Sequence, residues 1–186
     1  MEILALSARS IGLAVVLALA AMTSASGQGQ SHAPEYAVKA AYLYKFAPFV
    51  VWPSSAFSSP TSPFYVCVQG DDPFDGALDQ AVNGQRLDGH PAMVRRLKSI
   101  DPMTGCHILF LSGSHQQSAA DAMRNVKGEP VLTVSDEGRG VSGSVIQFVV
   151  KDSRVRFHID VEAAAANRMS ISSKLLSLAV AARSGG

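Results

Sequence analysis

The segment that most constrains the fold is CHILFLSGS, Cys106–Ser114, which contains an uninterrupted run of apolar residues. A strand with one face in water alternates apolar and polar residues, whereas a continuous apolar run indicates a strand buried on both faces. Phe64–Gly70 (FYVCVQG) and Pro130–Asp136 (PVLTVSD) are further predicted strands. Strands buried on both faces are typical of parallel sheets covered by helices, so the pattern predicts an α/β fold.

Helical segments alternate with these strands. We expect helices at Asp72–Val82, after a capping residue at Ser114, and at the C-terminus over Val161–Met169 and Ser172–Ala182. The segment Ser144–Asp160 holds two alternating runs about a turn at Lys151–Ser153, which is typical of a β-hairpin. The pattern therefore predicts a three-layer sandwich, with a central mixed, mainly parallel sheet and helices on both faces.

The N-terminal residues have the pattern of a secretory signal peptide. Arg9 precedes the apolar run Ile11–Met22, and small residues follow, with cleavage expected after Ala25 or Gly27. Twelve apolar residues are fewer than the about 20 that span a bilayer, although an uncleaved anchor is the alternative. We therefore expect a signal peptide at 1–27, a flexible lead-in at 28–34 and one exported domain at 35–183, with no membrane insertion after cleavage.

Charge and cysteine content limit the possible partners. The formal net charge is +1, which gives no electrostatic footprint for nucleic acid, and the densest basic cluster, Arg95–Lys98, is expected to be a solvated strand edge. The two cysteines, Cys67 and Cys106, predict one disulfide in an oxidising compartment, with two free buried thiols as the alternative.

No segment predicts catalysis. Gly138–Gly143 (GRGVSG) matches the G-x-G-x-x-G pattern, but a predicted strand follows it where dinucleotide binding requires a helix. The histidines lack metal-binding spacing, and Asp71, Asp72 and Asp75 are explained by a loop and a helix N-terminus. We expect no catalytic residues, no metal and no cofactor; a hydrolase is the most distant alternative.

The segment Tyr36–Pro53 (YAVKAAYLYKFAPFVVWP) predicts a helix that is apolar almost all the way round, broken near Pro48. One face, which includes Tyr36, Ala40 and Leu43, suits the sheet. The opposite side carries Val38, Tyr42, Lys45 and Phe49. This second side either meets another subunit or a partner, or lies under a second layer of the same chain, or forms an aromatic ligand cage.

Four segments in order resemble the YfiR family of exported bacterial proteins: VKAAYLYKFAPFVVWP, CHILFLS, VLTVSD and RFHIDVEAAAANRMSISSKLLSLA. The resemblance covers about residues 35–182. It implies a periplasmic protein that binds the periplasmic sensor domain of a YfiN-type inner-membrane diguanylate cyclase and lowers cyclic di-GMP synthesis; release favours surface attachment and biofilm. It also implies a homodimer and a strand-linking disulfide through Cys67 and Cys106. Some relatives carry a second, closely spaced cysteine pair near 138–150, which this chain lacks.

A periplasmic small-molecule binding protein, working beside a transporter or sensor kinase, is the alternative function. In α/β folds ligands bind at the carboxyl ends of parallel strands. A pocket near Gly70–Asp72 and Ser112–Ser114 would favour this alternative, whereas an exposed aromatic patch on the first helix would favour the inhibitor.

Overall fold

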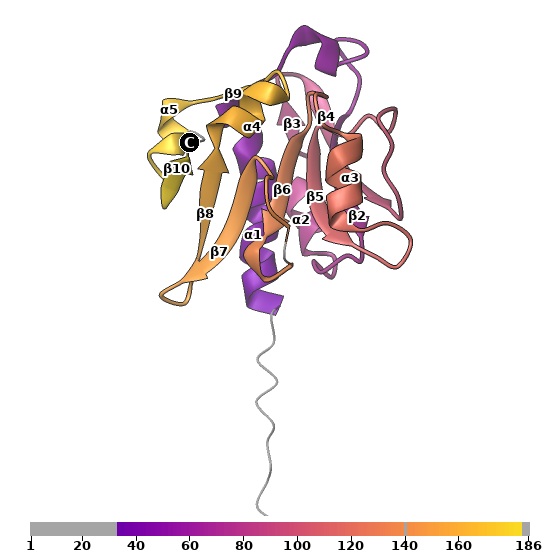
Figure 1. Ribbon diagram of the computed structural model, residues 1–186. Helices are drawn as coiled ribbons and strands as arrows, with labels where there is room; N and C mark the ends of the chain where they lie inside the picture. The colour runs from indigo at the N-terminus through magenta and orange to yellow at the C-terminus, as the bar shows by residue number, and fades with distance from the viewer. Residues whose placement is uncertain (1–32, 140, 184–186) are drawn as a thin grey trace, which may run out of the picture. The chain divides into compact units, whose positions relative to one another are not determined.

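The computed structural model describes residues 33–139 and 141–183, so the predicted signal peptide lies outside the described residues. The described elements form one compact unit around an eight-stranded sheet with the order β10-β8-β7-β6-β5-β2-β4-β3 (Figure 1). Its strands are β2 (Phe64–Gly70), β3 (Arg86–Leu87), β4 (His90–Leu97), β5 (Ile108–Gly113), β6 (Leu132–Asp136), β7 (Ile146–Lys151), β8 (Arg154–Asp160) and β10 (Ala181–Arg183). None of the described helices is long and apolar enough to cross a membrane.

The sheet is mixed and mainly parallel, which confirms the predicted fold class. The five strands β4, β2, β5, β6 and β7 run parallel to one another. β8 then returns antiparallel to β7 through a turn in which Asp152 and Ser153 have φ values of 51° and 56°. Two central residues with positive φ match the right-handed twist of a two-residue hairpin, so the predicted hairpin is confirmed.

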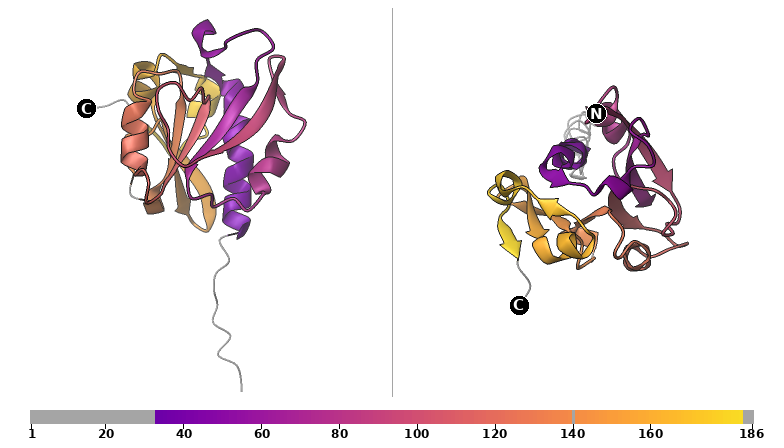
Figure 2. Two further views of the ribbon diagram at one scale, coloured as in Figure 1. Left: turned by 90° about the vertical axis from the view of Figure 1, so that its right-hand side faces the viewer. Right: turned by 90° about the horizontal axis from the view of Figure 1, so that it is seen from above.

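Helices cover both faces of the sheet. α1 (Ala33–Phe46) and α2 (Ala77–Val82) lie on one face, and α3 (Ala119–Asn125) and α4 (Val161–Ala166) lie on the other (Figures 1 and 2). Alternate residues of one strand serve the two layers. In β2, Val66 and Val68 belong to the core cluster that contains α1 and α2, whereas Cys67 belongs to the cluster that contains α3.

The first helix ends earlier than a single helix over Tyr36–Pro53 would. α1 stops at Phe46 and a 3₁₀ turn (η1, Ala47–Phe49) follows, because Pro48 has no N–H to continue the helical ladder. The chain then forms β1 (Val50–Val51), which pairs antiparallel with β9 (Ser170–Ile171) in a separate two-stranded sheet. The break expected near Pro48 is therefore confirmed.

Two predicted helix starts were wrong. α2 begins at Ala77 rather than Asp72, because Asp75 and Gly76 adopt left-handed conformations, with φ values of 46° and 81°, that end any earlier helix. α3 begins at Ala119, and its cap is Ser118 rather than Ser114, since the Ser118 hydroxyl accepts the Asp121 N–H at 3.1 Å. In both cases a local turn precedes the helix, so the helix begins later in the chain than predicted.

The C-terminal helix predicted at Ser172–Ala182 was also wrong over most of its length. Only α5 (Ser173–Leu176) is helical, and Ala181–Arg183 forms β10, parallel to β8. The Val180 N–H donates to the Phe157 carbonyl at 2.9 Å. The unpaired edge of β8 offers the backbone hydrogen-bond partners, and this tertiary pairing outweighs the helix propensity of leucine and alanine.

Candidate functional site

Three of the four residues predicted on the outer side of the first helix surround one hollow. Val38, Tyr42 and Lys45 line it together with Ala37 and Ala41, and we call these five residues the α1 hollow. Val38 is 45% exposed, which is high for a valine on a packed helix. The α1 hollow is thus an apolar surface with a lysine at its rim, a composition that suits contact with another molecule.

Tyr42 is not directed wholly away from the sheet, contrary to its placement on the outer side. Its ring centroid lies 5.7 Å from Phe46, 6.2 Å from Phe148 and 5.7 Å from Phe157. These contacts draw one side of the ring into the core, because the buried stripe of α1 includes Lys39, Leu43 and Phe46 and is therefore centred closer to position 42 than the apolar pattern indicates. Aromatic packing of this kind fixes the rotamer, so Tyr42 offers a rigid wall to the α1 hollow.

Phe49 does not belong to the α1 hollow. It lies in η1, after the end of α1, and packs half-buried against the main core cluster. The change from an α-helix to a 3₁₀ turn rotates the positions after Phe46, so a projection at 100° per residue no longer applies to Phe49. The structure therefore brings together Val38, Tyr42 and Lys45 but not Phe49.

A buried charge cluster fastens α1 to the end of β6, and the sequence analysis missed it. Lys39 is fully buried and forms ion pairs with Glu35, four residues earlier on α1, and with Asp136, the last residue of β6. The Tyr36 hydroxyl donates to the same Asp136 carboxylate at 3.1 Å. Arg139 adds a weak contact, 3.4 Å from its Nη2 to the Tyr36 hydroxyl.

The electrostatic balance of this cluster favours charged Lys39. Burial by itself lowers the pKa of Lys39, but the hydrogen bonds to Asp136 and Glu35 outweigh burial and raise that pKa above its ordinary value. Buried ion pairs contribute little net stability, yet leaving one charge without its partner is strongly destabilising. The cluster therefore fixes the position of α1, and with it the α1 hollow, relative to the sheet.

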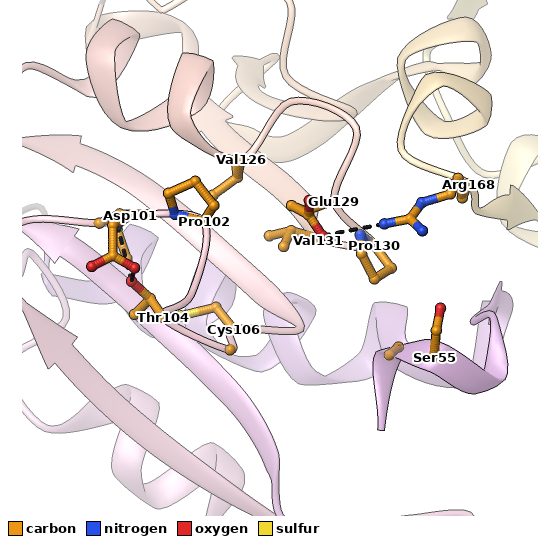
Figure 3. Close-up of a pocket in the computed structure, with 13 residues that line it drawn as sticks. Ser55, Asp101, Pro102, Thr104, Cys106, Val126, Glu129, Pro130, Val131 and Arg168 are labelled. Carbon is orange, nitrogen blue, oxygen red and sulfur yellow. Dashed lines mark hydrogen bonds and ion pairs between the residues drawn. The ribbon is translucent and has the colours of Figure 1, made fainter. Parts of the chain in front are cut away.

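A disulfide joins Cys67 of β2 to Cys106, just before β5, with their Cα atoms 5.9 Å apart. This pairing agrees with the one expected from the sequence. Cys106 also lines a cavity of about 300 Å³ at the end where β5 and β6 begin, together with Thr104, Val131 and Arg168 (Figure 3). Figure 3 shows Arg168 reaching towards Glu129, and its Nη2 lies 3.2 Å from the Glu129 carboxylate.

A buried histidine lies near this end of the sheet. Tyr65 donates its N–H to His107 Nδ1 at 3.0 Å, so Nε2 carries the proton and donates to the Ala56 carbonyl at 3.0 Å. Phe57 stacks on the His107 ring at 4.9 Å. Burial lowers the pKa of His107 to about 4, against the hydrogen bond to Ala56, so the ring is neutral at ordinary pH.

The opposite end of the sheet, where the small-molecule alternative places a pocket, is closed between β2 and β5. The Asp71 N–H donates to the Gly113 carbonyl at 3.0 Å, and the Ser112 hydroxyl donates to the Asp71 carbonyl. A Cβ at Gly70 would lie 2.1 Å from the Gly113 oxygen. These backbone contacts leave no room for a ligand between the two strand ends.

The carboxylate of Asp72, one of the aspartates singled out in the sequence, has structural partners. Asp72 accepts the Phe74 N–H at 2.8 Å and pairs with Arg96, and no group of acidic, histidine or cysteine residues suited to a metal occurs among residues 33–139 and 141–183. The glycine-rich segment Gly138–Gly143 includes Gly140, which lies outside the described residues, and the chain continues from it into β7.

The fold and these features define a disulfide-bonded, mixed α/β domain with an apolar hollow on its first helix. A comparison with family models identifies the domain more closely. The chain belongs to the YfiR/HmsC-like family, whose model matches residues 36–180, and the family resemblance inferred from the sequence is thereby confirmed. A search of curated proteins gave no match.

Proposed function

We propose that this protein is a periplasmic regulator that binds the periplasmic sensor domain of an inner-membrane diguanylate cyclase and lowers cyclic di-GMP synthesis. The observation that carries the proposal is the YfiR/HmsC-like family match over residues 36–180. The apolar run and small-residue exit within residues 1–27 support export to the periplasm, and a stable exported domain with one disulfide fits that compartment.

The α1 hollow is the proposed contact surface. Val38 supplies exposed apolar area, Tyr42 supplies an aromatic wall held by the core, and Lys45 supplies a charge at the rim. Rigid aromatic residues surrounded by less critical contacts are typical of interface hot spots. The same surface is available for a second copy of the chain, which is the proposed homodimer.

Inhibition by such a protein is a shift of population in the receptor. A regulator with equal affinity for the active and inactive receptor changes nothing, whereas moving the receptor from 1:99 to 99:1 requires about a 10⁴-fold difference in affinity. The residues of the α1 hollow are therefore expected to contact a part of the receptor that differs between its two states. This activity is binding and requires no catalytic group.

The first test measures cellular cyclic di-GMP in a strain that lacks the gene and in the same strain with the exported protein restored. The proposal expects the level to rise on deletion and to fall on restoration. An unchanged cyclic di-GMP level in cells that express the cyclase would rule out the proposed inhibitor function. Fractionation of the same cells, with N-terminal sequencing of the mature protein, tests periplasmic location and cleavage.

A variant pair maps the surface. Val38→Glu places a charge in the α1 hollow, and Met103→Glu places the same charge on a side chain that is 91% exposed and outside this hollow. We expect Val38→Glu to lose inhibition while it keeps the melting temperature, and Met103→Glu to keep both. Sedimentation equilibrium of the two variants shows whether the α1 hollow also holds the dimer together.

The cavity beside Cys106 supports a second candidate function, small-molecule binding. Its volume of about 300 Å³ is at the lower end of the range of ligand pockets, and its wall combines Val131 and Pro130 with the Glu129–Arg168 ion pair. A screen of small amphipathic metabolites by melting temperature tests this candidate. A hit whose effect persists in a variant that fills the cavity, such as Thr104→Trp, would place the ligand elsewhere.

A further inference from the structure

The outer edge of β4 is unpaired over most of its length. β3 pairs with β4 only at His90 and Pro91, and the Gln85 carbonyl accepts the Ala92 N–H at 2.9 Å. β3 ends the order of the sheet, and no strand in the described part of the chain lies beside Met93–Leu97 on that side. We call this stretch, Met93–Leu97, the β4 edge; β3 and β4 are labelled in Figure 1.

The backbone of the β4 edge is oriented to receive another strand. Successive residues of a strand direct their N–H and C=O groups to opposite sides. Because Ala92 donates outward to Gln85, Val94 and Arg96 also direct their backbone groups outward. A row of unpaired donors and acceptors of this kind is a template for an added strand.

The charged side chains of β4 do not block this row. Sheet edges are often protected by charges that point along the edge. Here two aspartates hold Arg96 on the α2 side. Its Nε lies 2.6 Å from the Asp72 carboxylate, and its Nη1 lies 3.0 Å from the Asp79 carboxylate. Arg95 lies over the Tyr65 ring, 4.4 Å from its centroid. Both guanidinium groups are thus fixed on the two faces of the strand, and the backbone between them is open.

A hollow beside the β4 edge provides space for a side chain of the added strand. It lies between α2 and β4, and Val82, Gly84, Met93 and Val94 are among its lining residues. Met93 is 49% exposed. Its side chain lies on the same face as that of Arg95, opposite α2, where a flexible, polarizable thioether offers the added strand a second apolar contact.

Charge selects the kind of partner. No carboxylate in the described residues forms an ion pair with Arg95 or Lys98, whereas Arg96 is already neutralised. A second copy paired along the same edge would bring its own Arg95 and Lys98 close to those of the first copy, and like charges on neighbouring strands are unfavourable. An acidic segment would meet complementary charge instead.

We propose that the β4 edge binds an extended, acidic segment of another protein as an additional strand of the sheet. The inference goes beyond the proposed function, because this surface is separate from the α1 hollow and its test does not require the cyclase. Main-chain hydrogen bonds to Val94 and Arg96 supply the pairing, the hollow beside α2 takes an apolar side chain, and Arg95 and Lys98 favour acidic residues.

The test uses a synthetic peptide of alternating valine and glutamate, with a valine–lysine peptide as the matched control. Two-dimensional NMR of the whole mature protein follows the amide protons of Val94 and Arg96. We expect the acidic peptide to shift both amide resonances and to lose affinity with added salt, and the basic peptide to leave them in place. Equal binding of both peptides, or no shift at millimolar peptide, would overturn the proposal.

Two variants separate strand addition from simple charge attraction. Val94→Pro removes a donor that makes no bond within the sheet, a position at which edge strands tolerate proline, and we expect it to abolish the acidic-peptide shift. Lys98→Glu changes an exposed side chain and is expected to weaken binding about threefold, the size of an exposed ion pair. Dimerisation of the protein through β4, seen as concentration-dependent broadening at Val94, would overturn the choice of a foreign acidic partner.

Discussion

Replacing Lys39 by methionine is the sharpest test of how α1 is held on the sheet. Methionine keeps an unbranched apolar stem in the fully buried site but removes the ammonium group. Asp136, which is 6% exposed, then keeps two neutral donors among the described residues, the Tyr36 hydroxyl at 3.1 Å and the Gly138 N–H at 3.3 Å. A buried carboxylate that loses its cation costs about 3–5 kcal/mol. For a domain of this size that loss lowers the melting temperature by about 10 °C.

The assay is urea unfolding followed by the fluorescence of Trp52, the single tryptophan, whose ring packs edge-on against Phe64 at 5.6 Å. A double-mutant cycle combines Lys39→Met with Asp136→Leu. The double variant has no orphaned charge at β6, so its loss of unfolding free energy should be smaller than the sum of the single losses by about 2 kcal/mol. Lys45→Met, on an exposed position of the same helix, is the control and should change stability by less than about 0.5 kcal/mol.

The pH dependence provides an independent check. Because the pKa of Lys39 is raised in the folded protein, its contribution is complete below the ordinary value of 10.5 and is lost as pH rises through the folded pKa. The wild type should therefore lose stability on the alkaline side more steeply than Lys39→Met. Additive losses in the cycle, together with identical alkaline limbs, would refute the view that Lys39 and Asp136 act as a pair.

Three further perturbations have defined outcomes. Cys67→Ser opens a loop of 39 residues and should lower unfolding stability by about 3–4 kcal/mol, and a melting temperature unaffected by reductant would contradict a structural role for the bridge. Because the pKa of His107 is lowered to about 4, stability should fall by about 3 kcal/mol as pH drops from 6.5 to 4, and His107→Gln should flatten this part of the pH–stability curve. Gly70→Ala places a Cβ 2.1 Å from the Gly113 oxygen and should lower the free energy of unfolding by more than about 3 kcal/mol. Gly76→Ala, at a similar φ of 81° but in open space, should lower it by about 1 kcal/mol. Equal melting temperatures of the two variants would show that the steric clash is not the cause.

Burial patterns predicted the central strands of the sheet because the order of apolar and polar residues in a strand depends on which of its faces are covered. The continuous apolar run before Ser112 is needed only where both faces of a strand are covered, and it became β5 in the middle of the sheet. β10 could not be predicted in this way. Ala181–Arg183 has no strand pattern, and it is extended because β8 offers a free edge that only the tertiary fold creates.

The site was predictable only in part, for a related reason. Helical periodicity identified Val38 and Lys45 as outward-facing, since this depends only on neighbours along α1. Burial of Lys39 depends on Asp136, which lies 97 residues further along the chain. A lysine four residues after Glu35, inside the stripe that faces the sheet, was the available signal, and a strand-ending aspartate was its natural partner.

The pairing of β1 with β9 has a consequence for how the chain acquires its structure. Val50 of β1 pairs with Ile171 of β9, so a strand near the start of the domain needs a strand near its end. Until residues 132–171 are in place, α1 can pack against Phe74 and α2 but lacks Asp136 and Phe148, so part of its apolar surface remains in water. Contacts this distant form late and slowly, and exposed apolar segments attract chaperones and aggregation in the meantime. The first helix of the domain is therefore expected to stay incompletely covered until the C-terminal strands fold, so a chaperone that shields this helix should raise the yield of folded protein.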